Sequence, residues 1–147
     1  MDRALRAKIV DILAHTSDMS IATVRPDGWP QVTTVSFVSD GTTIFFITGA
    51  KAQKAKNIAK NDKVSLTVDR PYKDWNGILG LSLGGTATRI TDETQIADIE
   101  KLMAKKFPQA ADFSMPEEAL AVFKITPKVI SVLDYSKGFG HTDTVTL

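Results

Sequence analysis

The sequence has no cysteine among its 147 residues and only two histidines, His15 and His141. Without cysteine, disulfide bonds, thiolate nucleophiles and thiolate-ligated metals are excluded, and two histidines so far apart in sequence do not predict a zinc site. We therefore expect no metal centre. The absence of cysteine also agrees with a reducing compartment.

Long apolar runs are missing as well. No stretch approaches the roughly 18 apolar residues of a membrane span. The chain opens with Met-Asp-Arg-Ala-Leu-Arg, which does not lead into the apolar segment of a signal peptide. We expect a cytoplasmic protein with no membrane partner.

Neither sign of charge is in large excess, since 18 Lys and Arg oppose 17 Asp and Glu for a net charge of +1. This balance argues against a nucleic-acid partner, which would select a strongly basic surface. Apolar residues make up 43% and charged residues 24% of the chain, an ordinary globular mixture. The length predicts one domain over residues 1–147.

Apolar periodicity predicts three helices. The first covers residues 2–15 with Asp2 as its N-cap, and the second covers residues 51–61. A third begins at Thr91 or Asp92 and ends before Pro108, and a loop is expected over residues 109–118.

Runs rich in β-branched and aromatic residues predict about six strands. The first three are joined by short turns, one of them at Asp40-Gly41, and are expected to form an antiparallel meander. Strands so closely spaced favour a barrel or a sandwich, because the helices between them are too few for a parallel βαβ sheet. Seven runs carry this pattern: Met19–Val24, Gln31–Val38, Thr42–Thr48, Val64–Val68, Gly77–Arg89, Ala121–Ile125 and Val129–Leu133, the last two being the final clear strands of the chain.

A lysine cluster follows the third predicted strand. Lys51, Lys54 and Lys56 lie around the start of the second predicted helix, just after Thr48-Gly49. Free N–H groups and the positive dipole end of a helix suit a phosphate, lysine adds charge, and the Thr48 hydroxyl is a further donor. These residues predict phosphate binding, against the alternative of a solvated lysine-rich surface.

Four segments in this order resemble the pyridoxamine 5'-phosphate oxidase-like, FMN-binding split-barrel family. They are residues 21–36, 44–58, 61–66 and 123–127, and the resemblance extends over about residues 5–135. It implies a mainly β fold with flanking helices, built as a six-stranded antiparallel Greek-key split barrel. It also implies a homodimer with two FMN sites at the subunit interface.

The resemblance also implies roles for residues around the lysine cluster. Thr48 matches the threonine that ends a strand near the flavin, and Lys54 matches the lysine of the family's phosphate-binding Ser-Arg-Lys triplet. The triplet reads Ala52-Gln53-Lys54 here, so its serine and arginine are absent. Gln53 takes the arginine position and is expected to contact the cofactor. Lys51, three residues before Lys54, is expected to restore the lost charge.

The second predicted strand carries the expected contact with the isoalloxazine ring. By the resemblance, Thr33, Thr34, Val35 and Ser36 line the ring, partly through backbone groups, and Thr33 stands where true oxidases often have arginine. The alternative is an ordinary threonine-rich strand whose side chains alternate between its two faces.

Aromatic residues in loops form a further candidate set. Trp75 and Tyr72 follow the fourth predicted strand and Trp29 lies in the first turn, so each is expected either to stack on a ligand or to seal the barrel or the dimer interface. In the polar tail, Lys137 and His141 are candidates for contact with a substrate or a flavin edge. His15 is expected only to cap the first helix.

No Ser-His-Asp arrangement, paired-carboxylate motif or metal signature is present, so no catalytic residue is predicted. A cofactor that carries the chemistry fits this absence. The expected function is an FMN-dependent oxidoreductase that transfers hydride to or from a small organic substrate at the dimer interface. The alternatives are a non-catalytic protein that binds or sequesters flavin or haem, and a deazaflavin-dependent reductase.

Overall fold

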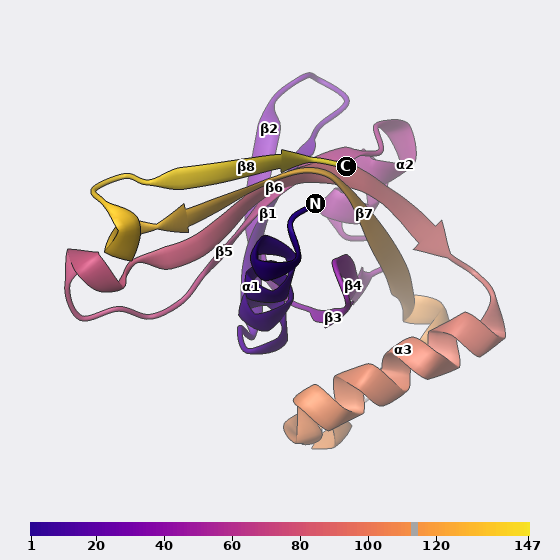
Figure 1. Ribbon diagram of the computed structural model, residues 1–147. Helices are drawn as coiled ribbons and strands as arrows, with labels where there is room; N and C mark the ends of the chain where they lie inside the picture. Colours follow the sequence, from indigo (N-terminus) through magenta and orange to yellow (C-terminus); the bar gives the residue numbers. More distant parts are fainter. Residues whose placement is uncertain (113–114) are drawn as a thin grey trace.

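The computed structural model describes residues 1–112 and 115–147, which form a curled antiparallel sheet flanked by helices (Figure 1). Three α-helices are present in these ranges, α1 (Arg3–Ala14), α2 (Gln53–Lys60) and α3 (Glu93–Lys106). The strands are β1 (Asp18–Val24), β2 (Pro30–Ser36), β3 (Val38–Asp40), β4 (Thr43–Gly49), β5 (Lys63–Asp69), β6 (Leu79–Ile90), β7 (Leu120–Asp134) and β8 (Thr142–Thr146). Short 3₁₀ turns are η1 (Trp75–Gly77), η2 (Pro108–Asp112), η3 (Glu117–Ala119) and η4 (Tyr135–Lys137).

The three predicted helices are confirmed. Asp2 caps α1 by accepting the Leu5 N–H at 3.0 Å, and Asp92 caps α3 by accepting the Gln95 N–H at 2.9 Å. His15 is the C-cap residue of α1. The loop expected over residues 109–118 contains η2 and the start of η3, and its residues 113–114 lie outside the described residues.

The strand order is β2-β1-β5-β6-β7-β4-β3, with β8 added beside β7, and every pairing is antiparallel. The antiparallel split-barrel architecture is thus confirmed, although the described chain contains eight strands and not six. The expected meander of the first three strands is confirmed only in part. The antiparallel β1–β2 pair and the β3–β4 hairpin at Asp40-Gly41 are both present. The second predicted strand is divided into β2 and β3, however, and β4 pairs with β3 and β7 and not with β2.

Strand β7 is continuous where two strands were predicted. Pro127, in the gap between the two predicted strands, lies opposite Gly85, where the β6–β7 register shifts between Gly84 and Gly85. A proline lacks the N–H that the ladder uses, and a bulge is a place where that loss is tolerated. The first half of β7 pairs with β4 and its second half pairs with β8, so this one strand joins both of them to the sheet.

The polar tail also forms a strand that the sequence analysis did not predict. Strand β8 runs back along β7 with Val145 opposite Ile130, and Figure 1 shows the two strands extending together to the left of the molecule. Three threonines alternate with Asp143 and Val145, a pattern that suits a strand. The run is short and polar, so it lacks the apolar signal from which the other strands were predicted.

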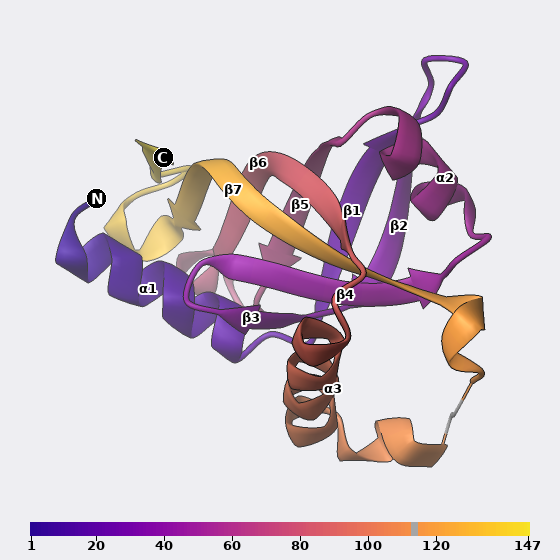
Figure 2. The same ribbon diagram turned by 90° about the vertical axis from the view of Figure 1, so that its right-hand side faces the viewer.

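Two apolar cores hold the elements together. The main core fills the curl of the sheet and includes the α1 residues Ile9, Ile12 and Leu13, as the predicted helical stripe requires. Helix α3 has a core of its own, in which Ile99 and Phe107 pack against residues of β3, β6 and β7. Figure 2 accordingly shows α3 below the sheet, outside the curl. Within the described residues, no helix combines the length and the apolar character needed to span a membrane.

Candidate cofactor site

The end of β4 and the start of α2 bring the predicted phosphate residues together. The Lys54 Nζ donates to the Thr48 Oγ1 at 3.4 Å, and both side chains are half-buried. Lys51 lies in the connecting loop with its side chain exposed, and Lys56 is exposed on the second turn of α2. One ammonium group is therefore held beside the strand end, and a second is free to approach from solvent.

Helix α2 begins without a capping side chain. Its N-cap residue is Ala52, and the first helical hydrogen bond runs from the Lys56 N–H to the Ala52 carbonyl at 3.2 Å. The N–H groups of Gln53, Lys54 and Ala55 have no helical acceptor, so they are available to an anion. The first turn of α2 also contains no acidic residue that would repel one.

Gln53, at the arginine position of the triplet, begins a side-chain network within the fold. Its Nε2 donates to the Asn57 Oδ1 at 2.8 Å, along its own helix. Asn57 is completely buried, and its Nδ2 donates to the Thr23 Oγ1 at 2.9 Å and the Gln31 Oε1 at 3.1 Å. Sequence analysis missed Asn57, although a polar residue between the buried positions Ala55 and Ile58 was a usable signal.

The four residues predicted to line a flavin ring are divided between the two faces of β2. Thr33 and Val35 lie opposite the buried β1 residues Ile21 and Met19, so they face the core. Thr34 is exposed on the outer face. The Ser36 Oγ donates to the Asp18 Oδ1 at 2.8 Å and is already engaged.

Two polar features of β2 have no partner among the described residues. The Thr33 Oγ1 is buried without a hydrogen-bond partner among the described residues, which is uncommon for a buried hydroxyl. Strand β2 also ends the sheet, so one side of its backbone has no strand partner within the described ranges. The Gln31–Asn57 hydrogen bond joins this strand to α2, so β2 and α2 lie side by side.

Trp75 is not part of this group in the single chain. It lies in η1 at the tip of the extended part of the sheet, where its ring centroid is 5.6 Å from that of Phe139. Phe139 in turn meets Tyr135 edge-on at 5.4 Å. Figure 1 shows this end of the sheet far to the left of α2.

The tail residues singled out from the sequence lie near the same tip. The Asp143 Oδ2 is 3.1 Å from the His141 Nε2 and 3.3 Å from the Lys137 Nζ. The hydrogen bond from His141, with a smaller effect of Lys137, lowers the pKa of Asp143. These groups form a small charged cluster that is separate from α2.

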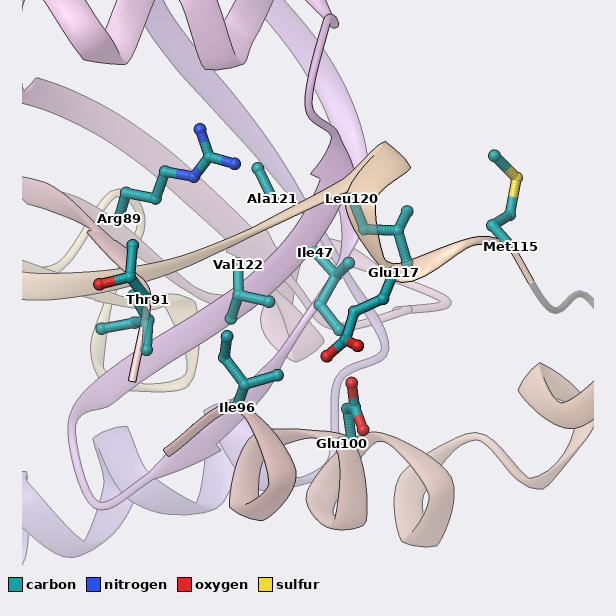
Figure 3. A pocket seen from close by; sticks show the side chains of 11 residues that line it. Ile47, Arg89, Thr91, Ile96, Glu100, Met115, Glu117, Leu120, Ala121 and Val122 are labelled. Carbon is teal, nitrogen blue, oxygen red and sulfur yellow. The ribbon is translucent and has the colours of Figure 1, made fainter. Parts of the chain in front are cut away.

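A cavity of about 450 Å³ lies elsewhere, between α3 and strands β4, β6 and β7. Its floor includes Ile47, which points to the opposite face of β4 from its neighbour Thr48. Figure 3 shows the carboxylates of Glu100 and Glu117 directed toward each other at its mouth. None of the residues predicted to bind a cofactor lines this cavity.

Comparison with known structures shows that the fold is shared. The chain matches a haem-binding protein from Mycobacterium smegmatis with a TM-score of 0.83 and 18% identity, covering 99% of this chain but only 59% of that one. It matches HutZ, the haem storage protein from Vibrio cholerae, with a TM-score of 0.71 and 17% identity over 95% and 92% of the two chains. A pyridoxamine 5'-phosphate oxidase-like protein from Listeria innocua gives a TM-score of 0.72 and 25% identity over 88% and 98%.

Sequence comparison identifies the family. No curated protein gives a significant match. The family profile described as pyridoxamine 5'-phosphate oxidase, however, matches residues 5–134, which is most of the chain. The match includes β1 to β7 and therefore the whole group around β2, β4 and α2. The chain belongs to the pyridoxamine 5'-phosphate oxidase family.

Proposed function

We propose that this protein binds FMN along β2 with the flavin phosphate at the start of α2, and that it acts as an oxidoreductase on a small organic substrate. The observation that carries the proposal is the Lys54–Thr48 contact beside an uncapped helix start. A charged lysine, a hydroxyl and three free N–H groups converge there, which is the donor set that a phosphate monoester requires.

Each part of the site would have a distinct task. Lys54 and the first N–H groups of α2 bind the phosphate, and Thr48 orients the Lys54 ammonium. The free edge of β2 lies against the ring, with its unpaired backbone groups as the contacts. Bound FMN supplies the hydride-transfer chemistry, which accounts for the absence of a catalytic motif in the sequence.

A homodimer completes this proposal. Trp75 and Phe139 are 64% and 80% exposed although their rings contact each other, so they form an apolar surface at the tip of the sheet. Exposed apolar patches of this kind mark interaction sites. Because Trp75 lies far from α2 of its own chain, we assign this tip to the dimer interface, where it reaches the site of the second copy.

The test is a titration of the purified protein with FMN, followed by absorption and by quenching of flavin fluorescence. We expect a yellow complex whose affinity falls at least tenfold in Lys54→Ala, because a charge-assisted contact with phosphate contributes about 1.5–3 kcal/mol. Lys60→Ala is the matched control, since Lys60 lies at the opposite end of the same helix. Unchanged FMN affinity in Lys54→Ala, or no binding by the wild type, would refute the assignment.

Haem is the second candidate cofactor. Support comes from the shared fold of the Mycobacterium smegmatis haem-binding protein and the Vibrio cholerae haem storage protein. Histidine is a common ligand of haem iron, and His141 is half-buried in the tail, whereas His15 caps α1. A haem titration distinguishes the two candidates, because haem binding predicts a Soret shift that His141→Ala removes and Lys54→Ala leaves in place.

A further inference from the structure

The buried amide of Asn57 connects three separate parts of the proposed site. Its Oδ1 accepts from Gln53, the first residue of α2, and its Nδ2 donates to Thr23 on β1 and Gln31 on β2. All three contacts are 3.1 Å or shorter. Gln31 lies two residues before Thr33, so the network extends from the phosphate end of the helix to the strand expected beside the ring.

Such a network is not required to bury α2. The helix has only eight residues and already packs Ala55 and Ile58 into the core, and an apolar residue at position 57 would extend that packing. A buried primary amide is tolerated only when its polar atoms have partners, and here both of them do. A fully bonded amide of this kind fixes one relative position of the groups that it joins, which an apolar contact does not.

We propose that Asn57 is a positioning residue that holds the first turn of α2, and with it Lys54, at a fixed distance from β2. The inference rests on the proposed FMN site and deepens it by naming what sets its ligand selectivity. The ring would bind along β2 whether or not α2 is held in place. The phosphate reaches its donors only when α2 is held, so the Gln53–Asn57–Gln31 network controls the preference for FMN over riboflavin.

A purely structural role predicts a different pattern. If Asn57 only stabilised the fold, replacing it would lower the free energy of unfolding and weaken both flavins equally. A positioning role predicts that the phosphate-bearing flavin alone is affected. The ratio of the two dissociation constants therefore separates the two roles without any measurement of turnover.

The experiment measures dissociation constants for FMN and for riboflavin in the wild type, Asn57→Leu and Gln53→Ala. Asn57→Leu keeps the number and branching of the side-chain heavy atoms but removes all three hydrogen bonds. Gln53→Ala breaks the network at its half-buried end and leaves Asn57 bonded to β1 and β2, so it stays informative if Asn57→Leu does not fold. Gln95→Ala is the matched control, because Gln95 lies in the first turn of α3, outside the site.

We expect FMN binding to weaken about tenfold in both site variants, which is about the effect of losing one hydrogen bond to the phosphate. Riboflavin binding should stay within about twofold of the wild type. In the ligand-free protein, hydrogen exchange of the Lys56 amide, which makes the first helical hydrogen bond of α2 to the Ala52 carbonyl, should become faster in the same variants. Equal weakening of both flavins, or an unchanged FMN constant in a folded variant, would overturn this inference alone. A wild type that binds neither flavin would overturn the proposed function as well.

Discussion

Lys8 and Asp134 form an ion pair across 126 positions of the sequence, with the Lys8 Nζ 2.7 Å from the Asp134 Oδ2. Asp134 is buried at the end of β7, and its other oxygen accepts from the Ser136 N–H and Oγ. The pair fixes α1 to the point where β7 turns into η4. The N-terminal helix and the C-terminal hairpin are thereby held as one unit.

The first prediction concerns acid stability. The Lys8 hydrogen bond, helped by Ser136, lowers the pKa of Asp134 to about 2 from its ordinary value of 3.8. Because the folded-state pKa lies below the unfolded one, the stabilisation is complete above pH 3.8 and is lost as the pH falls toward 2. In urea unfolding, Asp134→Asn should be less stable than the wild type by about 1–2 kcal/mol at pH 7. The difference should shrink below pH 3.8, and a difference independent of pH would contradict it.

The second prediction concerns the close approach of β6 and β7. A Cβ at Gly85 would lie 2.5 Å from the Thr126 carbonyl oxygen and 3.1 Å from the Pro127 Cα, both of them backbone atoms. At Gly84 the nearest atom is the Val129 Cγ1 at 3.3 Å, which a small side-chain shift can relieve. Gly85→Ala should therefore destabilise the protein by about 1–3 kcal/mol in urea unfolding, and Gly84→Ala by less than half as much. Equal effects would show that the bulge tolerates a side chain.

The third prediction concerns Lys106 at the end of α3. Its Nζ donates to the carbonyls of Phe37 at 3.0 Å and Leu13 at 3.3 Å and lies 4.0 Å from the centre of the Phe37 ring. Lys106→Met should cost about 1–2 kcal/mol in the free energy of unfolding, because two carbonyls lose a charged donor and the ring loses a cation. Lys105→Met, at an exposed neighbouring position, is the control and should stay within about 0.5 kcal/mol. A similar loss in both variants would argue for a general effect of charge.

Features that depend on local spacing were the ones predictable from the sequence. The helical stripe of α1, its Asp2 cap and the hairpin at Asp40-Gly41 each involve residues a few positions apart. The contact of Lys54 with Thr48 was predictable for the same reason, since six residues and one tight loop separate them.

Features that depend on distant partners were not predictable. The continuity of β7 through Pro127 depends on Gly85 lying opposite it, more than 40 positions away. The Asn57 network needs Thr23 and Gln31 from another part of the chain. No local pattern gives the register that places them together. Trp75 could not be placed either, because its position depends on how far β5 and β6 extend beyond the curl of the sheet.

The last prediction concerns the aromatic tip formed by Trp75, Tyr135 and Phe139. Phe139 follows Gly138 in the turn between β7 and β8 and is the most exposed of the three, so it contributes little to the fold of one chain. If the tip lies in the dimer interface, Phe139→Ser should raise the dimer dissociation constant by about two orders of magnitude, as loss of a central aromatic anchor does. Sedimentation velocity at micromolar protein should then show monomer with an unchanged unfolding midpoint per chain.

Trp29→Ser is the control, because Trp29 is 71% exposed but lies in the β1–β2 turn. Dissociation by Trp29→Ser and not by Phe139→Ser would place the interface at that turn instead. Since the same tip is proposed to reach the second copy's flavin, Phe139→Ser should also weaken FMN and riboflavin alike, unlike the phosphate-specific loss expected for Gln53→Ala.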